Sequence, residues 1–203
     1  MFSFHRPSEA TIRAYLTARA DCSFTYARVG CTRDEPQPQR GWNIDRHRVL
    51  LGHGEEVFRQ ACAAIKEWKM FPREVAQICW PEAPIRAGSI VGVLYWAAPA
   101  RLWLLCPAQI IHVFNEPVAT PEGEAEQFGF AYGTLAGHPE RGEERFLVEW
   151  IKTDDSVWYE LLAVSQPAHW LARLLGYPYA RYEQARFRRL SGAAMQQAVR
   201  PGT

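Results

Sequence analysis

The sequence lacks an excess of charge of either sign. Its 203 residues carry 23 Lys and Arg against 22 Asp and Glu, a formal net charge of +1 at pH 7. A chain this balanced has no overall field that attracts nucleic acid or an anionic membrane, so we expect no nucleic-acid partner. The charge is uneven, however: glutamates gather at residues 116–144 and arginines at 173–200. This pattern predicts an acidic loop that pairs with a basic C-terminal helix.

Long apolar runs are absent as well. The most membrane-like stretch, residues 87–115, is interrupted by Pro99, Arg101 and Pro107. A spanning helix needs about 20 continuous apolar residues, so we expect two sheet strands here and no integral membrane segment. The first 16 residues, MFSFHRPSEATIRAYL, lack the apolar core and cleavage site of a secretory signal. We therefore expect a cytoplasmic protein.

Sequence motifs for a cofactor or a metal are also missing. The chain has no GxSxG elbow, and its Gly52-His53-Gly54 turn lacks the lysine or third glycine of nucleotide-binding loops. His138, Glu140 and Glu144 are spaced neither as a calcium loop nor as a zinc-hydrolase helix. We expect no cofactor and no bound metal.

The five cysteines are odd in number and include no CxxC pair. In a reducing compartment such cysteines are buried thiols. A nucleophilic role for Cys31 would need His47 or His53 beside it, and a packed thiol is the favoured interpretation. The cysteines are Cys22, Cys31, Cys62, Cys79 and Cys106.

Hydrophobic periodicity predicts an α+β fold. Apolar residues recur at helical spacing after Ser8 and after Glu55, where Pro72 is expected to end the second helix. A last helix is expected to begin near Pro167, to be kinked or interrupted at Gly176 and Pro178, and to continue to Ala198. The strands are expected at residues 43–51, 89–97, 101–114, 128–135, 143–151 and 156–165. This order predicts a curved antiparallel sheet wrapped on a long C-terminal helix, with an extra N-terminal helix and with the helices on one face.

The richest segment for function is FGFAYGTLAGHPERGEERFLVEW, residues 128–150. Two alternating strands flank a polar turn, and alternation places Glu144 at the rim of an apolar face while Arg145 points to the other side. The small residues Gly129 and Gly133 leave room for a close neighbour, either the C-terminal helix or a ligand. The first strand carries Phe128, Phe130 and Tyr132 on one face, and the second carries Glu144, Phe146, Val148 and Trp150 on one face.

Four proton-handling residues lie within seven positions of this segment: His138, Glu140, Glu143 and Glu144. A carboxylate drawn toward apolar surface has a raised pKa, which suits a general acid or base near neutral pH. The alternative is a wide hairpin turn whose charges are simply solvated. The interpretation as a hairpin turn with solvated charges is favoured over a catalytic role.

These residues also carry a resemblance to a known family. The chain resembles uncharacterised protein family 0548, a domain of unknown function found in bacteria and plants. The carrying stretches are residues 25–71, 85–93, 128–150 and 156–174, the most specific part is GTLAGHPERGEERF, and the match covers nearly everything from Thr25 to about Leu190. It departs from the family at Gln166, where the family usually has arginine, and in a longer acidic insertion at residues 117–126. The resemblance implies a single domain at 1–203, with a helical extension at 1–24, a family domain at 25–190 and a flexible tail at 191–203.

In element order the family is similar to the helix-grip superfamily of START and polyketide cyclase-like domains. That similarity implies a cavity between the sheet and the C-terminal helix, and fold alone does not fix function. Our leading hypothesis is a protein that binds a hydrophobic small molecule or a lipid. The residues expected to line the cavity are Trp103, Phe114, Phe130, Tyr132, Phe146 and Trp150.

Two other hypotheses stay open. The first is a cyclase, dehydratase or hydrolase that uses Glu144 or His138 as general base and Tyr132 as a hydrogen-bond donor. The second is an interaction module whose arginine-rich C-terminal helix grips phosphate or an acidic partner, although pairing within the chain is preferred. The sequence does not indicate the ligand or the oligomeric state.

Overall fold

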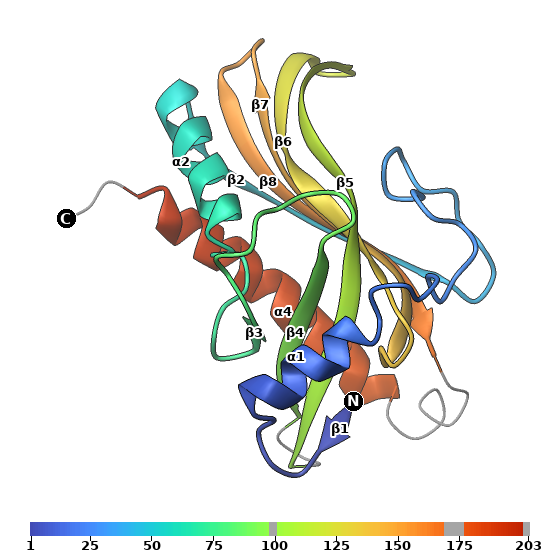
Figure 1. The fold of residues 1–203 in the computed structure, drawn as a ribbon. Coiled ribbons are helices and arrows are strands. Elements are labelled where there is room, and N and C mark those ends of the chain that lie inside the picture. Colours follow the sequence, from blue (N-terminus) through green and yellow to red (C-terminus); the bar gives the residue numbers. More distant parts are fainter. Residues whose placement is uncertain (98–100, 169–176, 201–203) are drawn as a thin grey trace.

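The computed structural model describes residues 1–97, 101–168 and 177–200. One antiparallel sheet runs through them in the order β2-β8-β7-β6-β5-β4-β3, and a short β1 pairs with β5 (Figure 1). The strands are β1 Phe2–Ser3, β2 Asn43–His53, β3 Ala76–Ile78, β4 Ile90–Ala97, β5 Leu102–Thr120, β6 Gly123–Thr134, β7 Glu140–Ile151 and β8 Ser156–Pro167. The sheet curls along its length, so it has a concave inner face and an outer face.

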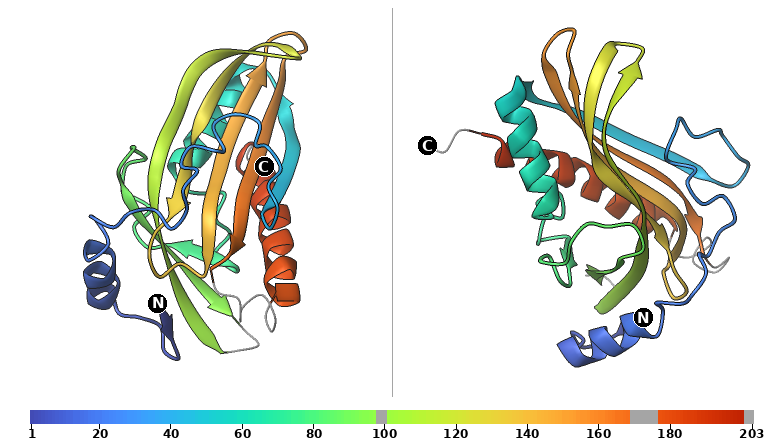
Figure 2. Two further views of the ribbon diagram at one scale, coloured as in Figure 1. Left: turned by 90° about the vertical axis from the view of Figure 1, so that its right-hand side faces the viewer. Right: turned by 45° about the horizontal axis from the view of Figure 1, so that its top comes forward.

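Three helices pack on this sheet: α1 Glu9–Thr17, α2 Glu55–Lys66 and α4 Tyr177–Ala198. Helices α2 and α4 lie on the inner face, and α1 lies on the outer face against β4 (Figure 2). Ser8 begins α1 by accepting a hydrogen bond from the backbone N–H of Thr11, as expected from the sequence. The fold is the predicted α+β helix-grip architecture, with its sheet wrapped on the C-terminal helix.

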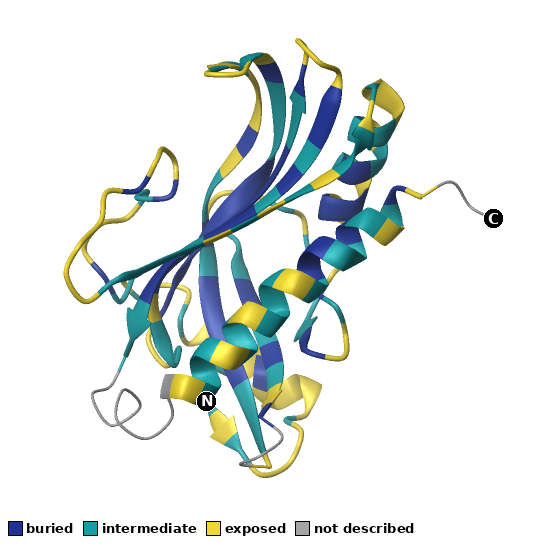
Figure 3. Cartoon of the chain, turned by 180° about the vertical axis from the view of Figure 1, so that it is seen from behind, coloured by how far each residue is buried: buried dark blue, intermediate teal, exposed yellow. Residues whose placement is uncertain are grey.

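The main core lies between the inner face and the two helices. Strand alternation sends Phe130, Phe146, Tyr159 and Leu161 inward, and all four are fully buried. The C-terminal half of α4 completes this core with the buried Met195, and Figure 3 shows dark blue there while the first half of the helix is teal and yellow. A second, smaller cluster joins Ile12, Leu16, Leu94 and Leu105 beneath α1.

Several predictions about the helices were wrong. Pro167 is the last residue of β8 rather than the first residue of a helix, and the described helix α4 begins at Tyr177. Part of the expected tail, residues 191–198, belongs to α4, since Ser191 and Met195 are fully buried against the sheet. The expected helical residues Trp170, Leu171, Leu174 and Leu175 lie outside the described residues.

Two further differences concern α1 and α2. Helix α2 ends at Lys66 rather than at Pro72, because Trp68 takes a positive φ of 57° and turns the chain. Helix α1 covers the outer face, so the helices do not share one face. Among the described residues, no helix is long and apolar enough to cross a membrane.

Candidate functional site

The β6–β7 hairpin brings Tyr132 and Glu144 together on the inner face. The two residues are direct partners in the antiparallel register. The Tyr132 hydroxyl donates a 2.6 Å hydrogen bond to Glu144 Oε2. The alternation of side chains along β7 therefore predicted the face of Glu144 correctly. Glu144 lies at the polar end of the inner face, and Phe130 and Phe146 lie next to it on the same face.

Glu144 is surrounded by protein yet keeps partial contact with solvent. Burial raises its pKa to about 7; Glu140 adds to the rise, while the hydrogen bond from Tyr132 and the charge of Arg188 oppose it. Burial and the neighbouring Glu144 also raise the pKa of Tyr132 far above its ordinary value, so its hydroxyl stays protonated. The pair therefore combines a permanent donor with a carboxyl group that titrates near neutral pH.

Helix α4 docks beside this pair through polar contacts. Arg181 Nη2 donates to Asp45 Oδ1 over 2.6 Å, and Arg188 Nη2 lies 3.3 Å from the same oxygen. Gln184 donates to Glu140, whose pKa is raised chiefly by burial. The first half of α4 therefore presents charged and amide groups to the end of the inner face that holds Glu144.

The described arginines of α4 pair within the chain, as the sequence interpretation preferred. Arg181 and Arg188 contact Asp45 on β2, and Arg186 contacts Glu183 one turn away. The predicted acidic segment, residues 116–144, divides in two. Its first glutamates lie along the β5–β6 hairpin, whereas Glu140 and Glu144 lie near α4, where burial raises the pKa of both and the charge of Arg188 opposes the rise.

His138 sits in the turn before β7. Its Nδ1 accepts a 3.0 Å hydrogen bond from the Glu140 backbone N–H. Burial lowers its pKa to about 4, so the ring is neutral at neutral pH. Among the described residues, its hydrogen bonds are to the Glu140 backbone, and neither Tyr132 nor Glu144 is a partner.

The six aromatic residues predicted to line a cavity separate into two groups. Tyr132 packs between Phe130 and Phe146 on the inner face, and Trp150 lies farther along it against Phe58. Phe130 and Phe146 are fully buried and also contact Trp68 and Phe71, which fill the centre of this face.

The other two predicted residues face away from that group. Trp103 packs beneath α1, and Phe114 packs on Ala131 and Leu147 of the outer face. A cavity of about 390 Å³ lies between α1, β3 and β4, and a smaller cavity lies beside Tyr26 and Trp42. Neither cavity is lined by any of the six aromatic residues.

Sequence reasoning grouped Glu143 with the proton-handling residues of the turn, but in the structure it is buried and faces the outer side. Its carboxylate accepts four hydrogen bonds: from the Tyr26 hydroxyl at 2.8 Å, the Gly30 N–H, the Thr32 N–H at 3.0 Å and the Thr32 hydroxyl at 2.9 Å. A Cβ on Gly133 would lie 2.1 Å from the Tyr26 oxygen. The close neighbour at Gly133 is therefore the segment before β2 and not the C-terminal helix that the sequence suggested as one alternative.

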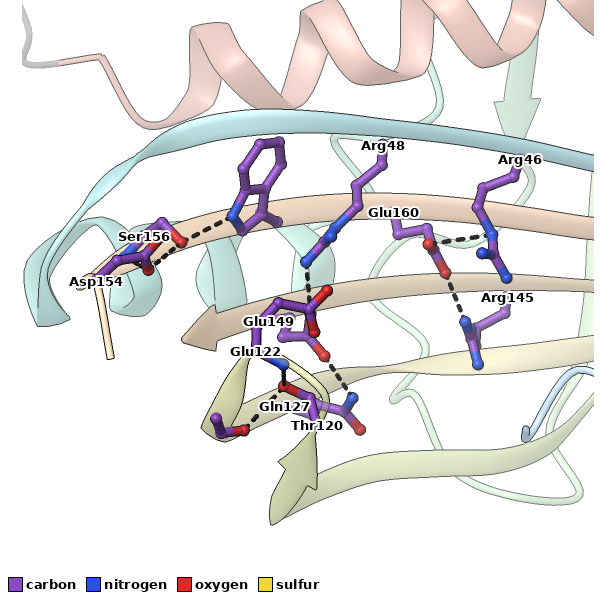
Figure 4. A network of polar contacts seen from close by, with 12 residues as sticks. Arg46, Arg48, Thr120, Glu122, Gln127, Arg145, Glu149, Asp154, Ser156 and Glu160 are labelled. Atoms are coloured by element: carbon purple, nitrogen blue, oxygen red, sulfur yellow. Dashed lines mark hydrogen bonds and ion pairs between the residues drawn. The ribbon is translucent and has the colours of Figure 1, made fainter. Parts of the chain in front are cut away.

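Arg145 extends this outer-face network. It donates to the Thr32 carbonyl at 2.7 Å and to Glu160 at 2.5 Å, and Glu160 also pairs with Arg46 (Figure 4). A second ion pair, Arg48 with Glu149, lies beside it. These carboxylates hold structural elements together rather than facing the candidate site.

The cysteines are all free thiols. Burial raises the pKa of Cys31 to about 12, and Glu143 adds to the rise, so this thiol stays protonated. In the part of the chain that the structure describes, no group of three or more His, Cys, Asp and Glu side chains is arranged to hold a metal ion.

Comparison with known proteins places the chain in a family. Residues 25–194 match the family described as "Domain of unknown function (DUF1990)". A UPF0548 protein of Dictyostelium discoideum is 35% identical over 201 residues, covering 92% of this chain and 90% of the relative. A UPF0548 protein of Arabidopsis thaliana is 35% identical over 78% of this chain and 74% of its own length. A UPF0548 protein of Deinococcus radiodurans is 29% identical over 98% of this chain and 94% of its own length.

Solved structures are similar at low sequence identity. A hypothetical protein of Helicobacter pylori matches with a TM-score of 0.50 at 10% identity, over 78% of this chain and 88% of the other. Norcoclaurine synthase of Thalictrum flavum gives a TM-score of 0.43 at 10% identity, over 78% of this chain and 86% of the synthase. Human STARD10 gives 0.43 at 10% identity, over 96% of this chain and 80% of its own. The match of residues 25–194 and the 35% identity to the Dictyostelium UPF0548 protein show that the chain belongs to the DUF1990 (UPF0548) family.

Proposed function

We propose that this protein binds an amphipathic small molecule between the inner face of the sheet and the first half of α4. The observation that carries the proposal is Glu144, a partly accessible carboxyl group with a pKa of about 7 at the polar end of a largely apolar face. Such a carboxyl group is largely removed from water and lacks a full set of hydrogen-bond partners, which is unfavourable. A ligand that donates a hydrogen bond to it would therefore be stabilised at this position.

The contacts of Glu144 indicate the chemistry of the ligand. Among the described residues, only Tyr132 donates a hydrogen bond to it, at Oε2. A carboxylate has about four acceptor positions, so the group retains capacity for a hydroxyl or an amine. The rings of Phe130 and Phe146 are fully buried, so partly buried residues of the same core supply the apolar part of the surface: Ala163, which pairs with Glu144, and Phe187 of α4. A molecule with an apolar body and one hydroxyl or amine group fits this arrangement.

Native mass spectrometry of protein purified from its own host tests the proposal. We expect wild-type protein to carry an additional non-covalent mass, and Glu144→Gln and Tyr132→Phe to carry at least about tenfold less of it, because one lost hydrogen bond to a charged group costs about 1.5–3 kcal/mol. Glu149→Gln is the matched control, since it removes a carboxylate of the same strand from the outer face. Equal loading of all four proteins would contradict the proposal.

Acid–base catalysis on the same molecule is a second candidate. It is favoured by the pKa of Glu144, which lies near neutral pH, beside the permanently protonated Tyr132 hydroxyl. Incubating the released molecule with fresh protein separates the two functions. Catalysis predicts a changed product that Glu144→Gln does not form, whereas binding alone returns the molecule unchanged.

The raised pKa of Glu144 also predicts a pH-dependent stability. Its folded pKa of about 7 lies above the ordinary value of 4.5, so its contribution is fully present below pH 4.5 and is lost as the pH rises through 7. Glu144→Gln should therefore match wild type at pH 4 and be more stable at pH 8, by up to about 3 kcal/mol. Urea unfolding at both pH values measures this difference, and an equal difference at the two values would refute the assignment.

A further inference from the structure

A hollow on the outer face lies between α1, β3 and β4, away from the Tyr132–Glu144 pair of the inner face (Figure 1). Its volume of about 390 Å³ falls in the range that is usual for small-molecule sites, about 300–1,000 Å³. We call it the α1 hollow. Six of its lining residues are Arg6, Glu9, Ile12, Trp80, Glu82 and Leu94.

The floor of the α1 hollow is apolar. Ile12 of α1 and Leu94 of β4 are 8% and 3% exposed, and both belong to the cluster beneath α1. Cys79 also lines the hollow, and burial raises the pKa of its thiol to about 11, so the thiol stays protonated and uncharged. An apolar group of a ligand therefore meets an uncharged surface here.

Side-chain contacts hold the walls of the hollow in place. Arg6 Nη2 donates a 2.9 Å hydrogen bond to Gln77 Oε1 of β3, and the guanidinium lies 5.4 Å from the Trp103 ring centroid. From α1, the Arg13 guanidinium lies 4.9 Å from the Trp80 ring centroid. The walls are therefore largely formed before a ligand binds, which lowers the entropic cost of binding.

The rim of the hollow carries charges of both signs. Arg6 and Glu82 are exposed, and within the part of the chain that the structure describes neither belongs to an ion pair. Glu9, the third charged residue of the rim, pairs with Arg13 at 3.1 Å. A guanidinium has several N–H donors, so Arg6 keeps most of them for a partner other than Gln77. One guanidinium and one carboxylate are thus available to a ligand.

These charges indicate the class of ligand. A molecule with only an anionic group would be repelled by Glu9 and Glu82, and a molecule with only a cationic group would be repelled by Arg6. A molecule that carries a carboxylate, an ammonium group and an apolar side chain complements the two available charges and the floor.

We propose that the α1 hollow binds a small zwitterion with an apolar side chain, the class of the free apolar amino acids. Arg6 donates to the carboxylate, and Glu82 accepts a hydrogen bond from the ammonium group. The apolar side chain packs on Ile12 and Leu94. The proposal does not depend on a ligand at Glu144, because the hollow lies on the other face of the sheet.

Titration of the full chain with L-phenylalanine and with L-leucine tests the proposal. The readout is the nitrogen-15 NMR signal of the Trp80 indole N–H, which is identified by its loss in Trp80→Phe. We expect this signal to shift with both amino acids, and glycine to bind at least about tenfold more weakly because it lacks the apolar group.

Two analogues of phenylalanine test the two charges separately. N-acetyl-L-phenylalanine has no ammonium group, and phenethylamine has no carboxylate. Each should bind about fivefold more weakly than L-phenylalanine, because an ion pair at an exposed rim is partly screened by water. Equal binding of either analogue would overturn the proposal, since the hollow would then recognise only one charge.

Arg6→Gln and Glu82→Gln should each weaken the binding of L-phenylalanine about fivefold. The matched control is Arg40→Gln with Glu122→Gln, which removes two exposed charges outside the hollow and should bind like wild type. Circular dichroism should show all variants folded. The proposal is overturned if neither amino acid shifts the Trp80 signal, or if the Arg6 and Glu82 variants bind as tightly as the control.

Discussion

Replacing Glu143 with alanine is expected to lower the free energy of unfolding by about 3–5 kcal/mol, because removing one member of a buried charged network leaves its partners unsatisfied. The side chain accepts hydrogen bonds from Tyr26, Gly30 and Thr32, and its residue is only 2% exposed. These bonds fasten the segment before β2 to the outer face, so the segment should also become accessible to protease. Chemical unfolding and limited proteolysis measure the two effects.

Glu149→Ala is the matched control for Glu143→Ala. Glu149 lies on the same strand and the same face, but its partner Arg48 has a side chain that is 31% exposed. Such a pair contributes at most about 1 kcal/mol. If the two variants lost equal stability, the buried network would not be the reason that Glu143 matters.

Replacing Phe146 with alanine is expected to cost about 3–5 kcal/mol of unfolding free energy, the range for a large aromatic side chain removed from a packed core. Phe146 is fully buried, and its ring centroid lies 5.2 Å from that of Phe71, 5.3 Å from Phe130 and 5.6 Å from Tyr132. These neighbours belong to β6 and to the segment after α2, so they cannot collapse into the space without moving the sheet or that segment.

Phe4→Ala provides the comparison for Phe146→Ala, because Phe4 is 78% exposed and should change stability by less than about 0.5 kcal/mol. Urea unfolding gives both values. A small loss of unfolding free energy in Phe146→Ala would mean that the ring lines an open space instead of filling the core. Phe146 would then be a residue that contacts a ligand, as the sequence predicted.

Local patterns predicted the fold class and the position of Glu144. Alternation in β6 and β7 is a property of each strand alone, and it correctly placed Tyr132 and Glu144 on the inner face. The capping of α1 by Ser8 is equally local. Such features need no knowledge of which distant segments meet.

Alternation along the sequence could not predict the face of the sheet on which Phe114 lies. A bulge between Ile110 and His112 shifts the register of β5 by one residue, so Trp103 and Phe114 share the outer face although their spacing is odd. The role of Glu143 was hidden for another reason. Its donors lie more than 100 residues away in a segment without regular structure, and only the folded chain brings them together.

The measurement that tests the central claim most directly is the carbon-13 NMR spectrum of protein labelled at its glutamate carboxyl groups. The molecule extracted from denatured wild-type protein is added back to protein freed of it. We expect the Glu144 resonance to shift, and its pKa to move from about 7, while Glu149 on the outer face stays unchanged. A spectrum in which Glu144 does not respond, or responds no more than Glu149, would contradict the assignment of this end of the inner face as the binding site.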